Sequence, residues 1–248
     1  MLPNISIAAP AYNEGEGLRL LVENWAHYLA SRFQPDDFEI VVCDDGSKDN
    51  TWEILGQLAK AYPSVKPCRH VVNQGAAAAL TTAIRHTTKS WVLLLDSDGQ
   101  YPIDNLDLFV KEMERAPAPA FIGYREQKAD SAFARFGSWI SGACCNWCHG
   151  THYRDFNCAL KLVDGTLLRD LDLEAKGLNY STEISSKILE RGVAMKEIAI
   201  IHRPREKGRS SRTLLRGTLH RFLFVTYIGW RQFLFKAGLL QRRTYSPS

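Results

Sequence analysis

The sequence lacks any hydrophobic run long enough to form a membrane-spanning helix. Its longest apolar stretch near the C-terminus, residues 222–230, falls well short of the roughly 20 residues that cross a bilayer. No basic segment, apolar core and cleavage site precede the first apolar segment, so we expect no secretory leader. We therefore predict a cytoplasmic protein that does not cross a membrane but can lie on its surface.

Cysteine is present but lacks the spacing of a disulfide or zinc framework. Cys145 and Cys148 form one spaced pair, with His149, His152 and Cys158 nearby. We assign no zinc site, because these residues lie partly on an expected helix and no second spaced pair accompanies them. We expect reduced thiols, which fit a cytosolic location.

Internal repeats and low-complexity linkers are also absent, and acidic residues are scarce in the last fifth of the chain. The 248 residues are 45% hydrophobic, enough for one large domain with an appendage. The net charge of +4 is uneven, since residues 201–248 contain eleven Lys and Arg but one acid, Glu206. This basic segment indicates contact with phosphates. Its large apolar residues would stay exposed on a nucleic acid, so we expect a lipid surface and no nucleic acid.

The sequence does contain a regular alternation of short apolar segments and helical segments. Strands are expected at residues 5–9, 38–43, 65–72, 91–95, 120–123, 156–162 and 193–201. Helices are expected at residues 17–32, 50–61, 104–115, 131–148 and 181–191, with another beginning at residue 75. This alternation predicts an α/β fold with a mostly parallel, doubly wound sheet flanked by helices.

The clearest chemical signal is the stretch Trp91–Gln100, an apolar strand that stops at two carboxylates. If the extended geometry continues past Leu95, Asp96 and Asp98 point to the same side. Carboxylates at a strand's carboxyl end suit Mg²⁺ or Mn²⁺ holding a diphosphate, although a solvated turn is the alternative. A second Asp-x-Asp at residues 170–172 has no buried strand directly before it. The context, more than the tripeptide, favours a metal site.

Two further segments place polar residues after expected strands. Asp44, Asp45, Gly46 and Ser47 offer acceptors for a base or ribose, or else form a turn and cap a helix. The segment Asn73–Gly75 would let a diphosphate approach a helix N-terminus, or it only begins a packed alanine-rich helix. Neither motif decides between its two interpretations by itself.

A basic loop and a basic-aromatic segment follow the last expected strand. Residues 202–212 include Arg205 and Ser210, and guanidinium groups pair well with phosphate oxygens, although a solvated loop can have the same composition. Residues 214–240 mix large apolar residues with Arg and Lys, as helices lying in a membrane interface do. The alternative for this segment is a helix that covers the protein's own core.

Six short motifs occur in one order along the chain. They are Pro10-Ala11-Tyr12-Asn13-Glu14, Asp44-Asp45-Gly46-Ser47, Asn73-x-Gly75, Asp96-x-Asp98-x-Gln100, Gly123-x-Arg125 and Arg205-x-x-Gly208-x-Ser210. Their order and spacing resemble glycosyltransferase family 2, particularly the dolichyl- or polyprenyl-phosphate sugar synthases. The resemblance covers roughly residues 4–212 and implies a GT-A fold, a UDP- or GDP-sugar donor and a divalent metal, Mg²⁺ or Mn²⁺.

The resemblance also implies roles for individual residues. The nucleoside would be held by Pro10, Tyr12, Glu14 and Asp44. Metal and diphosphate would be held by Asp96, Asp98 and Gln100, and phosphates would be faced by Arg125, Arg135 and Arg205. Asp45, Gly75 and Ser210 complete the set of donor-binding candidates. Two positions depart from the family pattern, namely Ala76 in place of a frequent Lys and Ser211-Arg212 in place of a single Lys.

We therefore predict an inverting, metal-dependent glycosyltransferase that moves one sugar to a polyprenyl-type phosphate at the cytoplasmic face of a membrane. An anionic acceptor oxygen needs cationic positioning more than a base, which makes Asp98, Arg125 and Arg205 the catalytic candidates. The first alternative is transfer to a hydroxyl of a glycan or glycolipid. That reaction needs a general base, for which Asp155 is the first candidate and Glu183 the second.

A second alternative is a nucleotide-sugar-binding protein without activity, against which the complete Asp96-x-Asp98-x-Gln100 motif argues. We divide the chain into a glycosyltransferase domain, residues 1–212, and a membrane-associating tail, residues 213–248. The expected partners are the sugar donor, the lipid phosphate and the membrane surface, and a membrane-protein partner or a homo-oligomer is left open.

Overall fold

A central mixed sheet organises the fold. The computed structural model describes residues 4–126, 132–174, 179–203, 214–241 and 244–245. The strands are β1 (Ile5–Ala11), β2 (Phe38–Asp44), β3 (Val65–Arg69), β4 (Trp91–Leu94), β5 (Ala120–Arg125), β6 (Lys161–Asp164) and β7 (Lys196–Ile200). The α-helices are α1 (Gly15–Ala30), α2 (Thr51–Ala61), α3 (Ala76–Arg85), α4 (Asn105–Arg115), α5 (Ala132–His149), α6 (Gly165–Arg169), α7 (Tyr180–Glu190) and α8 (Leu214–Lys236).

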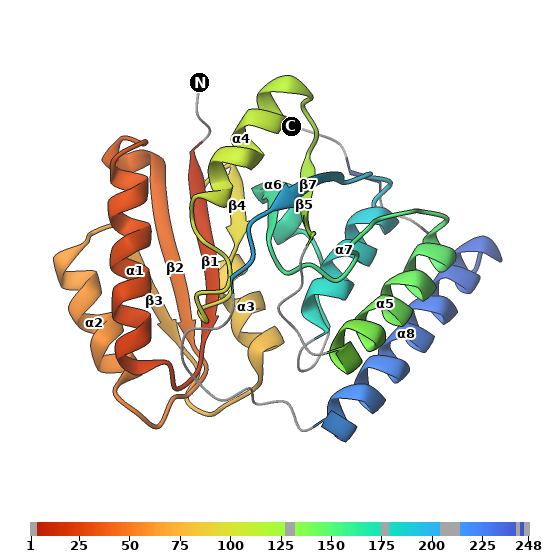
Figure 1. Ribbon diagram of the computed structural model, residues 1–248, viewed down its shortest axis with the longest axis horizontal. Coiled ribbons are helices and arrows are strands. Elements are labelled where there is room, and N and C mark those ends of the chain that lie inside the picture. The colour runs from red at the N-terminus through yellow and green to blue at the C-terminus, as the bar shows by residue number, and fades with distance from the viewer. Residues whose placement is uncertain (1–3, 127–131, 175–178, 204–213, 242–243, 246–248) are drawn as a thin grey trace.

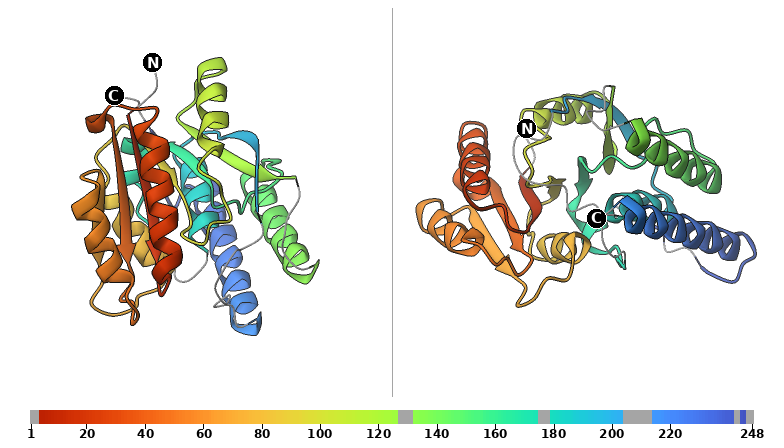
Figure 2. Two further views of the ribbon diagram at one scale, coloured as in Figure 1. Left: turned by 60° about the vertical axis from the view of Figure 1, so that its left-hand side comes forward. Right: turned by 60° about the horizontal axis from the view of Figure 1, so that its bottom comes forward.

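The sheet is mostly parallel, as the sequence predicted. Within the described residues the strand order is β3-β2-β1-β4-β6-β5-β7. Among the described strands, only β6 runs against its neighbours, pairing antiparallel with both β4 and β5. Helices α1 and α2 pack against each other and against β2, and α3 packs on β1 and β2 (Figures 1 and 2). These features confirm the α/β class with a helix-flanked, GT-A-like sheet.

The central strands end at one edge of the sheet, which is the lower edge in Figure 1. Strands β1 and β2 pair in parallel register until Ala11 lies beside Asp44, so the two strands end level. Every residue of these two strands is buried. Because both faces of a parallel sheet are covered, such strands are apolar nearly throughout, and their polar residues collect where they end.

The third strand is shorter than the sequence predicted. The expectation of a strand to residue 72 is wrong, because β3 ends at Arg69. The His70 N–H still donates to the Asp44 carbonyl at 2.8 Å, and the chain then leaves the sheet. Val71 and Val72 are exposed to 96% and 65%. Arg69 and His70 are therefore strand-end residues, at the same edge as Asp44.

The sixth strand begins later than expected, at Lys161 instead of residue 156. The preceding residues turn instead, with the Cys158 N–H donating to the Asp155 carbonyl at 3.0 Å. Helix α6 follows β6 directly and was not expected. Its first turn is capped by Asp164, whose side chain accepts from the Leu167 N–H at 2.9 Å. This short helix separates β6 from the second Asp-x-Asp sequence.

The last helix, α8, packs along α5 beside the main sheet (Figures 1 and 2). Ile228 is buried against Cys145 and Phe156 in a small second core. Arg231 pairs with Glu190 at 2.8 Å, which fastens α8 to α7 as well. No helix in the described parts of the chain combines the length and apolar character needed to cross a bilayer.

Candidate functional site

The end of β2 places a buried carboxylate, that of Asp44, at the edge of the sheet. The Asp44 side chain is fully buried, and its Oδ1 accepts from the Ser47 N–H at 3.1 Å. Arg69 Nε lies 3.0 Å from Asp44 Oδ2, but no donor in the described residues is aligned on that oxygen for a hydrogen bond. The charge of Arg69 compensates this oxygen, and a ligand N–H would supply the aligned hydrogen bond that it lacks.

Arg69 and Trp52 form one wall beside this acceptor. The Arg69 guanidinium lies 5.2 Å from the Trp52 ring centroid, a cation–π distance. Sequence reasoning missed Arg69 because it was placed inside the third strand. In the other strands, polar residues at the carboxyl end were taken as site candidates. The same rule would have found Arg69 if the third strand had been predicted to end there.

The turn after β1 is fixed by the turn after β2. The Asn13 N–H donates to Ser47 Oγ at 2.9 Å, and the N–H groups of Glu14 and Gly15 donate to Thr51 Oγ1 at 3.1 and 3.0 Å. Asn13 adopts a positive φ of 55°, which a short polar side chain tolerates. The turn therefore presents its backbone in one conformation at the sheet edge.

The nucleoside candidates that were predicted just after the first strand lie at the end of β1 and on the turn that follows it. Pro10 is buried within β1 and pairs in register with Cys43 of β2. Tyr12 is 39% exposed, and Glu14 is half-buried at the start of α1. Tyr12 and Glu14 thus lie on the same turn, one strand away from Asp44.

The loop before α3 is held by Asp45. The carboxylate of Asp45 accepts from the N–H groups of Gln74 and Gly75 at 2.9 and 2.7 Å, and from His70 Nδ1 at 2.8 Å. Gly75 has a φ of 96°, which glycine adopts without strain. Gly75 accordingly lies beside the turn after β2, at the end of the sheet where Asp44 is found.

Two carboxylates crowd the end of β4. The expected extension past Leu95 does not occur, because residues 97–98 form a turn. Asp98 and Asp96 are nonetheless close enough to influence each other. Burial, together with the negative charge of Asp98, raises the pKa of Asp96 to about 6. Tyr180 donates to Asp96 Oδ1 at 2.5 Å, and the Gln100 N–H donates to Asp98 Oδ1 at 3.1 Å.

These carboxylates fit a divalent cation. They are hard oxygen donors whose mutual repulsion a cation would relieve. The described residues include no group of three or more His, Cys, Asp or Glu side chains arranged for a metal. A cation at Asp96 and Asp98 would take its other ligands from the amide of Gln100, which stays a prediction, and from a phosphate or water, as Mg²⁺ commonly does. The residues present fit a metal shared between protein and ligand.

Arg125 and Asp155 form a buried ion pair beside the carboxylates. Arg125 Nε lies 2.7 Å from Asp155 Oδ2, and Nη2 lies 3.2 Å from Oδ1. Their side chains are only 10% and 2% exposed. Arg125 also attracts Asp96, whose pKa it lowers against the larger effect of burial. The fork geometry is that of a charge-assisted bidentate pair.

A buried lysine that sequence reasoning missed lies under this group. Lys161 is fully buried and donates to Ser181 Oγ at 2.8 Å. Burial lowers the pKa of Lys161 to about 8, although Asp155 and Asp96 pull it upward. Neither Lys161 nor Tyr180 had a sequence signal, because each lies in an otherwise ordinary strand or helix.

The last strand leads to the same place. The Arg203 N–H donates to the Gln100 carbonyl at 2.9 Å, and Asn105 exchanges two hydrogen bonds of 2.8 and 2.9 Å with the backbone of Ile201. The basic loop thus leaves the described residues beside Gln100. Arg205 and Ser210 themselves lie outside the described residues, as does the side chain of Arg135 on α5.

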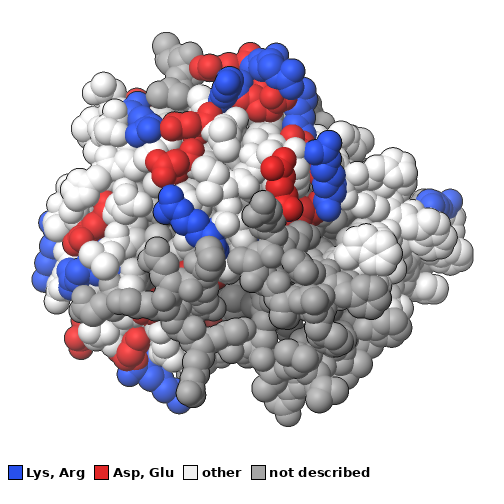
Figure 3. Space-filling view, in the orientation of Figure 1, with Lys and Arg blue, Asp and Glu red and all other residues white. Residues whose placement is uncertain are grey.

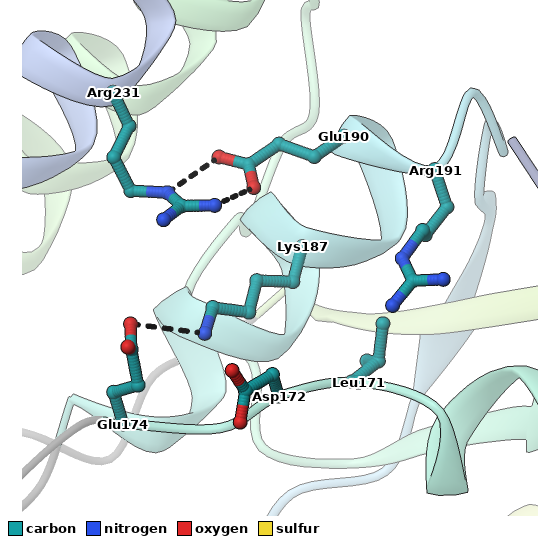
Figure 4. Close-up of a pocket in the computed structure, with 7 residues that line it drawn as sticks. All are labelled: Leu171, Asp172, Glu174, Lys187, Glu190, Arg191 and Arg231. Atoms are coloured by element: carbon teal, nitrogen blue, oxygen red, sulfur yellow. Dashed lines mark hydrogen bonds and ion pairs between the residues drawn. The ribbon is translucent and has the colours of Figure 1, made fainter. Parts of the chain in front are cut away.

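Glu183, the second candidate for a base, is buried on α7. It lies 3.1 Å from Lys187 Nζ and accepts from the Glu174 N–H at 2.7 Å. A separate pocket lies next to this helix (Figure 4), and its lining includes none of the strand-end residues described above. The pocket is lined by Leu171, Asp172, Glu174, Lys187, Glu190, Arg191 and Arg231. Because Lys187 pairs with Glu174 and Arg231 with Glu190, we interpret it as the polar junction that attaches α8.

A sheet of this strand order, with a carboxylate pair after the central strand, defines an α/β protein of the GT-A type. The chain belongs to glycosyl transferase family 2, whose family model matches residues 6–163. Similar solved structures include glucosyl-3-phosphoglycerate synthase from Mycobacterium tuberculosis in complex with Mn²⁺, UDP and glucosyl-3-phosphoglycerate. The comparison with this synthase gives a TM-score of 0.68 and 15% sequence identity, and it covers 96% of this chain and 81% of the synthase chain.

A mannosyltransferase from Pyrobaculum calidifontis, in complex with GDP-mannose and Mn²⁺, has the same fold. Its TM-score is 0.58 at 16% identity, over 97% of this chain and 77% of the other.

The curated relatives include a dolichyl-phosphate beta-glucosyltransferase from Trichomonas vaginalis, 37% identical over 44% of this chain and 35% of its own length. A dodecaprenyl-phosphate galacturonate synthase from Rhizobium johnstonii is 25% identical over 82% of this chain and 60% of its own length. The chain thus spans less than two thirds of these relatives.

Proposed function

We propose that the chain transfers one sugar, with inversion, from a nucleoside diphosphate sugar to a polyprenyl-type lipid phosphate at the cytoplasmic face of a membrane. The observation that carries the proposal is the crowded carboxylate pair Asp96 and Asp98, at the same sheet edge as the buried acceptor Asp44. Family membership supports the reaction class. The names of several relatives support the acceptor class.

The donor's base would bind at Asp44. The carboxylate of Asp44 would accept an N–H from the base, which both uracil and guanine carry. The neighbouring Arg69 can donate to a base carbonyl, and Trp52 limits where Arg69 can move. Tyr12 and Glu14, on the turn after β1, would complete the nucleoside site.

The diphosphate would lie between this turn and the end of β4. A bound Mg²⁺ or Mn²⁺ would be held by Asp96 and Asp98 and would stabilise the charge that develops on the leaving diphosphate. Gln100 supports the site through its backbone, since its N–H fixes Asp98 Oδ1. Tyr180 fixes Asp96 in the same way. These hydrogen bonds hold both carboxylates in place before the donor arrives.

The acceptor phosphate would meet the cations on the other side of the carboxylates. Arg125 is held by Asp155, and the Arg203 N–H donates to the Gln100 carbonyl. Arg205, two residues further along the sequence, is the other cation that we assign to the acceptor. A phosphate monoester is already anionic near neutral pH, so its oxygen can attack without a protein base once cations position it. The role left to Asp155 is then to orient Arg125.

The alternative acceptor is a sugar hydroxyl, with Asp155 as general base. A base must have an oxygen within hydrogen-bond reach of the proton that it takes. Both carboxylate oxygens of Asp155 accept from Arg125, and the side chain is almost fully buried. This arrangement favours the phosphate acceptor.

The donor and acceptor are tested separately. Binding of UDP, GDP and their sugar conjugates is measured by thermal shift with Mn²⁺ or with excess chelator, because a ligand of the folded state raises the unfolding temperature. We expect one nucleotide class to stabilise the protein only with metal. Transfer of radiolabelled sugar to polyprenyl phosphate, compared with polyprenol and a free glycan, identifies the acceptor. Sugar transfer to the glycan alone would contradict the lipid-phosphate proposal.

A further inference from the structure

Asp45 follows Asp44 directly, yet its contacts are of a different kind. Its own N–H donates to the Ala11 carbonyl at 2.8 Å, which fixes it between β1 and β2. Asp45 is only 1% exposed. Its carboxylate accepts hydrogen bonds from two backbone N–H groups and from one imidazole N–H, all of them in the loop between β3 and α3. These three hydrogen bonds hold a loop that is nearly thirty residues away in sequence.

His70 extends this contact to α3. Its Nδ1 lies 2.8 Å from Asp45 Oδ1, and its Nε2 lies 2.9 Å from Thr82 Oγ1. The imidazole is 10% exposed, so both contacts are shielded from water. His70 therefore connects the turn after β2 with the second half of α3.

The loop and the turn also touch through their backbones. The Asn73 side chain donates to the Asp45 carbonyl at 3.2 Å. A Cβ on Gly46 would lie 2.8 Å from Asn73 N, so a side chain there would push the loop away. The loop thus has no room to approach the turn more closely, and Asp45 prevents it from moving outward.

We infer that Asp45 and His70 are a positioning pair, which holds the loop of residues 70–75 against the nucleoside end of the donor site without touching the donor. The inference rests on the proposed nucleotide-sugar donor. Releasing the loop would free Gly75 and the start of α3, and would loosen the backbone that surrounds the buried acceptor Asp44. The measurable consequence is weaker donor binding with an unchanged rate once the donor is bound.

Two substitutions of His70 separate this role from a general structural role. In His70→Asn the amide nitrogen replaces Nδ1, so the bond to Asp45 is kept and the bond to Thr82 is lost. In His70→Gln the amide group reaches the position of Nε2, so the bond to Thr82 is kept and the bond to Asp45 is lost. If His70 only braces α3, the His70→Gln variant should bind the donor like the wild type. If His70 acts by positioning Asp45, the His70→Asn variant should do so instead.

The matched control is Glu39→Gln on β2, the strand that Asp45 directly follows. Glu39 is also fully buried and accepts hydrogen bonds from Ser6, Thr88 and Lys66. It lies near the opposite end of β2 from Asp45. Its loss should lower the unfolding temperature without altering nucleotide binding, because it is remote from the site.

The experiment measures the Kd of UDP and GDP with Mn²⁺ by calorimetry on the folded full chain, and donor KM and kcat in parallel. We expect His70→Gln and Asp45→Asn to raise Kd and KM about tenfold or more, with kcat within about threefold, while His70→Asn stays within about threefold of wild type. The inference would be wrong if all folded variants had the same Kd, or if His70→Asn bound the nucleotide more weakly than His70→Gln. Either result would leave the proposed function untouched. If the wild type binds neither nucleotide with metal, the proposed function fails as well.

Discussion

Asp98 is the residue at which the proposed metal requirement can be tested most cleanly. It is half-buried in a turn, and its Oδ1 accepts from the Gln100 N–H, a contact that an asparagine oxygen can keep. We expect Asp98→Asn to unfold near the wild-type temperature but to lose donor turnover by about two orders of magnitude or more, since metal stabilisation of a leaving group is worth several kcal/mol.

The control for this change is Asp172→Asn, in the exposed second Asp-x-Asp of the chain. It should leave turnover unchanged. Activity of the wild type in excess chelator, or full activity of Asp98→Asn, would contradict the metal site. Both are measured by release of nucleoside diphosphate from the donor.

Arg125 and Asp155 decide between the two acceptors. We expect Asp155→Asn to keep transfer within about tenfold, because an amide oxygen still accepts one hydrogen bond from the guanidinium. Arg125→Ala should raise the acceptor KM steeply with donor binding nearly intact. It should also lower stability, because it leaves the buried carboxylate of Asp155 without its bidentate partner.

The double variant, Arg125→Ala with Asp155→Asn, separates stability from function. Removing both charges should recover part of the lost stability, since Asp155 is then no longer a buried charge without its Arg125 partner. Acceptor affinity should stay low. If Asp155→Asn alone is inactive and its pH–rate profile loses the limb of a general base, the hydroxyl-acceptor reading is correct instead.

Among the elements, β2 contains a carboxylate that makes stability depend on pH. Burial alone would raise the pKa of Glu39, but hydrogen bonds from Lys66, Ser6 and Thr88 outweigh it and hold the pKa below that of an ordinary glutamate. The stabilisation is therefore complete above the unfolded-state pKa of about 4.3, and is lost as the pH falls through the folded-state pKa.

We expect Glu39→Gln to destabilise the protein by about 1–3 kcal/mol at pH 7, as the loss of charge-assisted hydrogen bonds does. The difference from wild type should shrink as the pH falls below about 4.3. Denaturant unfolding at several pH values measures this. A difference that stays constant down to pH 3 would show that the charge of Glu39 is not the stabilising feature.

On the scale of the whole molecule, α5 and α8 present an apolar surface away from the sheet. Large side chains exposed there are Trp139, Ile140, Trp147, Trp230 and Phe233. The right-hand side of Figure 3, over these helices, shows few Lys, Arg, Asp or Glu among the described residues. Exposed aromatic patches of this kind mark contact surfaces. We propose that this surface rests on the membrane that holds the acceptor.

Removing α8 would be a poor test, because Ile228 and Arg231 pack onto the main domain. Trp147→Ser with Trp230→Ser changes only exposed side chains. We expect this variant to float less with anionic vesicles, while Leu20→Ser, an exposed apolar change on α1, should float like wild type. Rising salt should weaken flotation further, since each base near an anionic surface contributes about 1 kcal/mol. Unchanged flotation of the double variant would contradict this membrane surface.

The sequence by itself determined the class of fold and the residues to examine. Apolar strands and amphipathic helices alternate because a sheet covered on both faces needs them, and this pattern is local. Polar residues such as Asp44 and Asp96 stand out for the same reason, since they end apolar runs. The strand order and the antiparallel β6 were not accessible, because they depend on which distant segments pair.

Only the tertiary structure decided what these polar residues contact. Asp44 and Asp45 are neighbours in sequence, yet one pairs with Arg69 at the end of β3 and the other holds the loop before α3. Arg125 meets Asp155 across 30 residues, and Tyr180 meets Asp96 across 84. The physical reason is that a buried polar group must find a partner wherever the packed chain brings one, and sequence spacing does not encode that position.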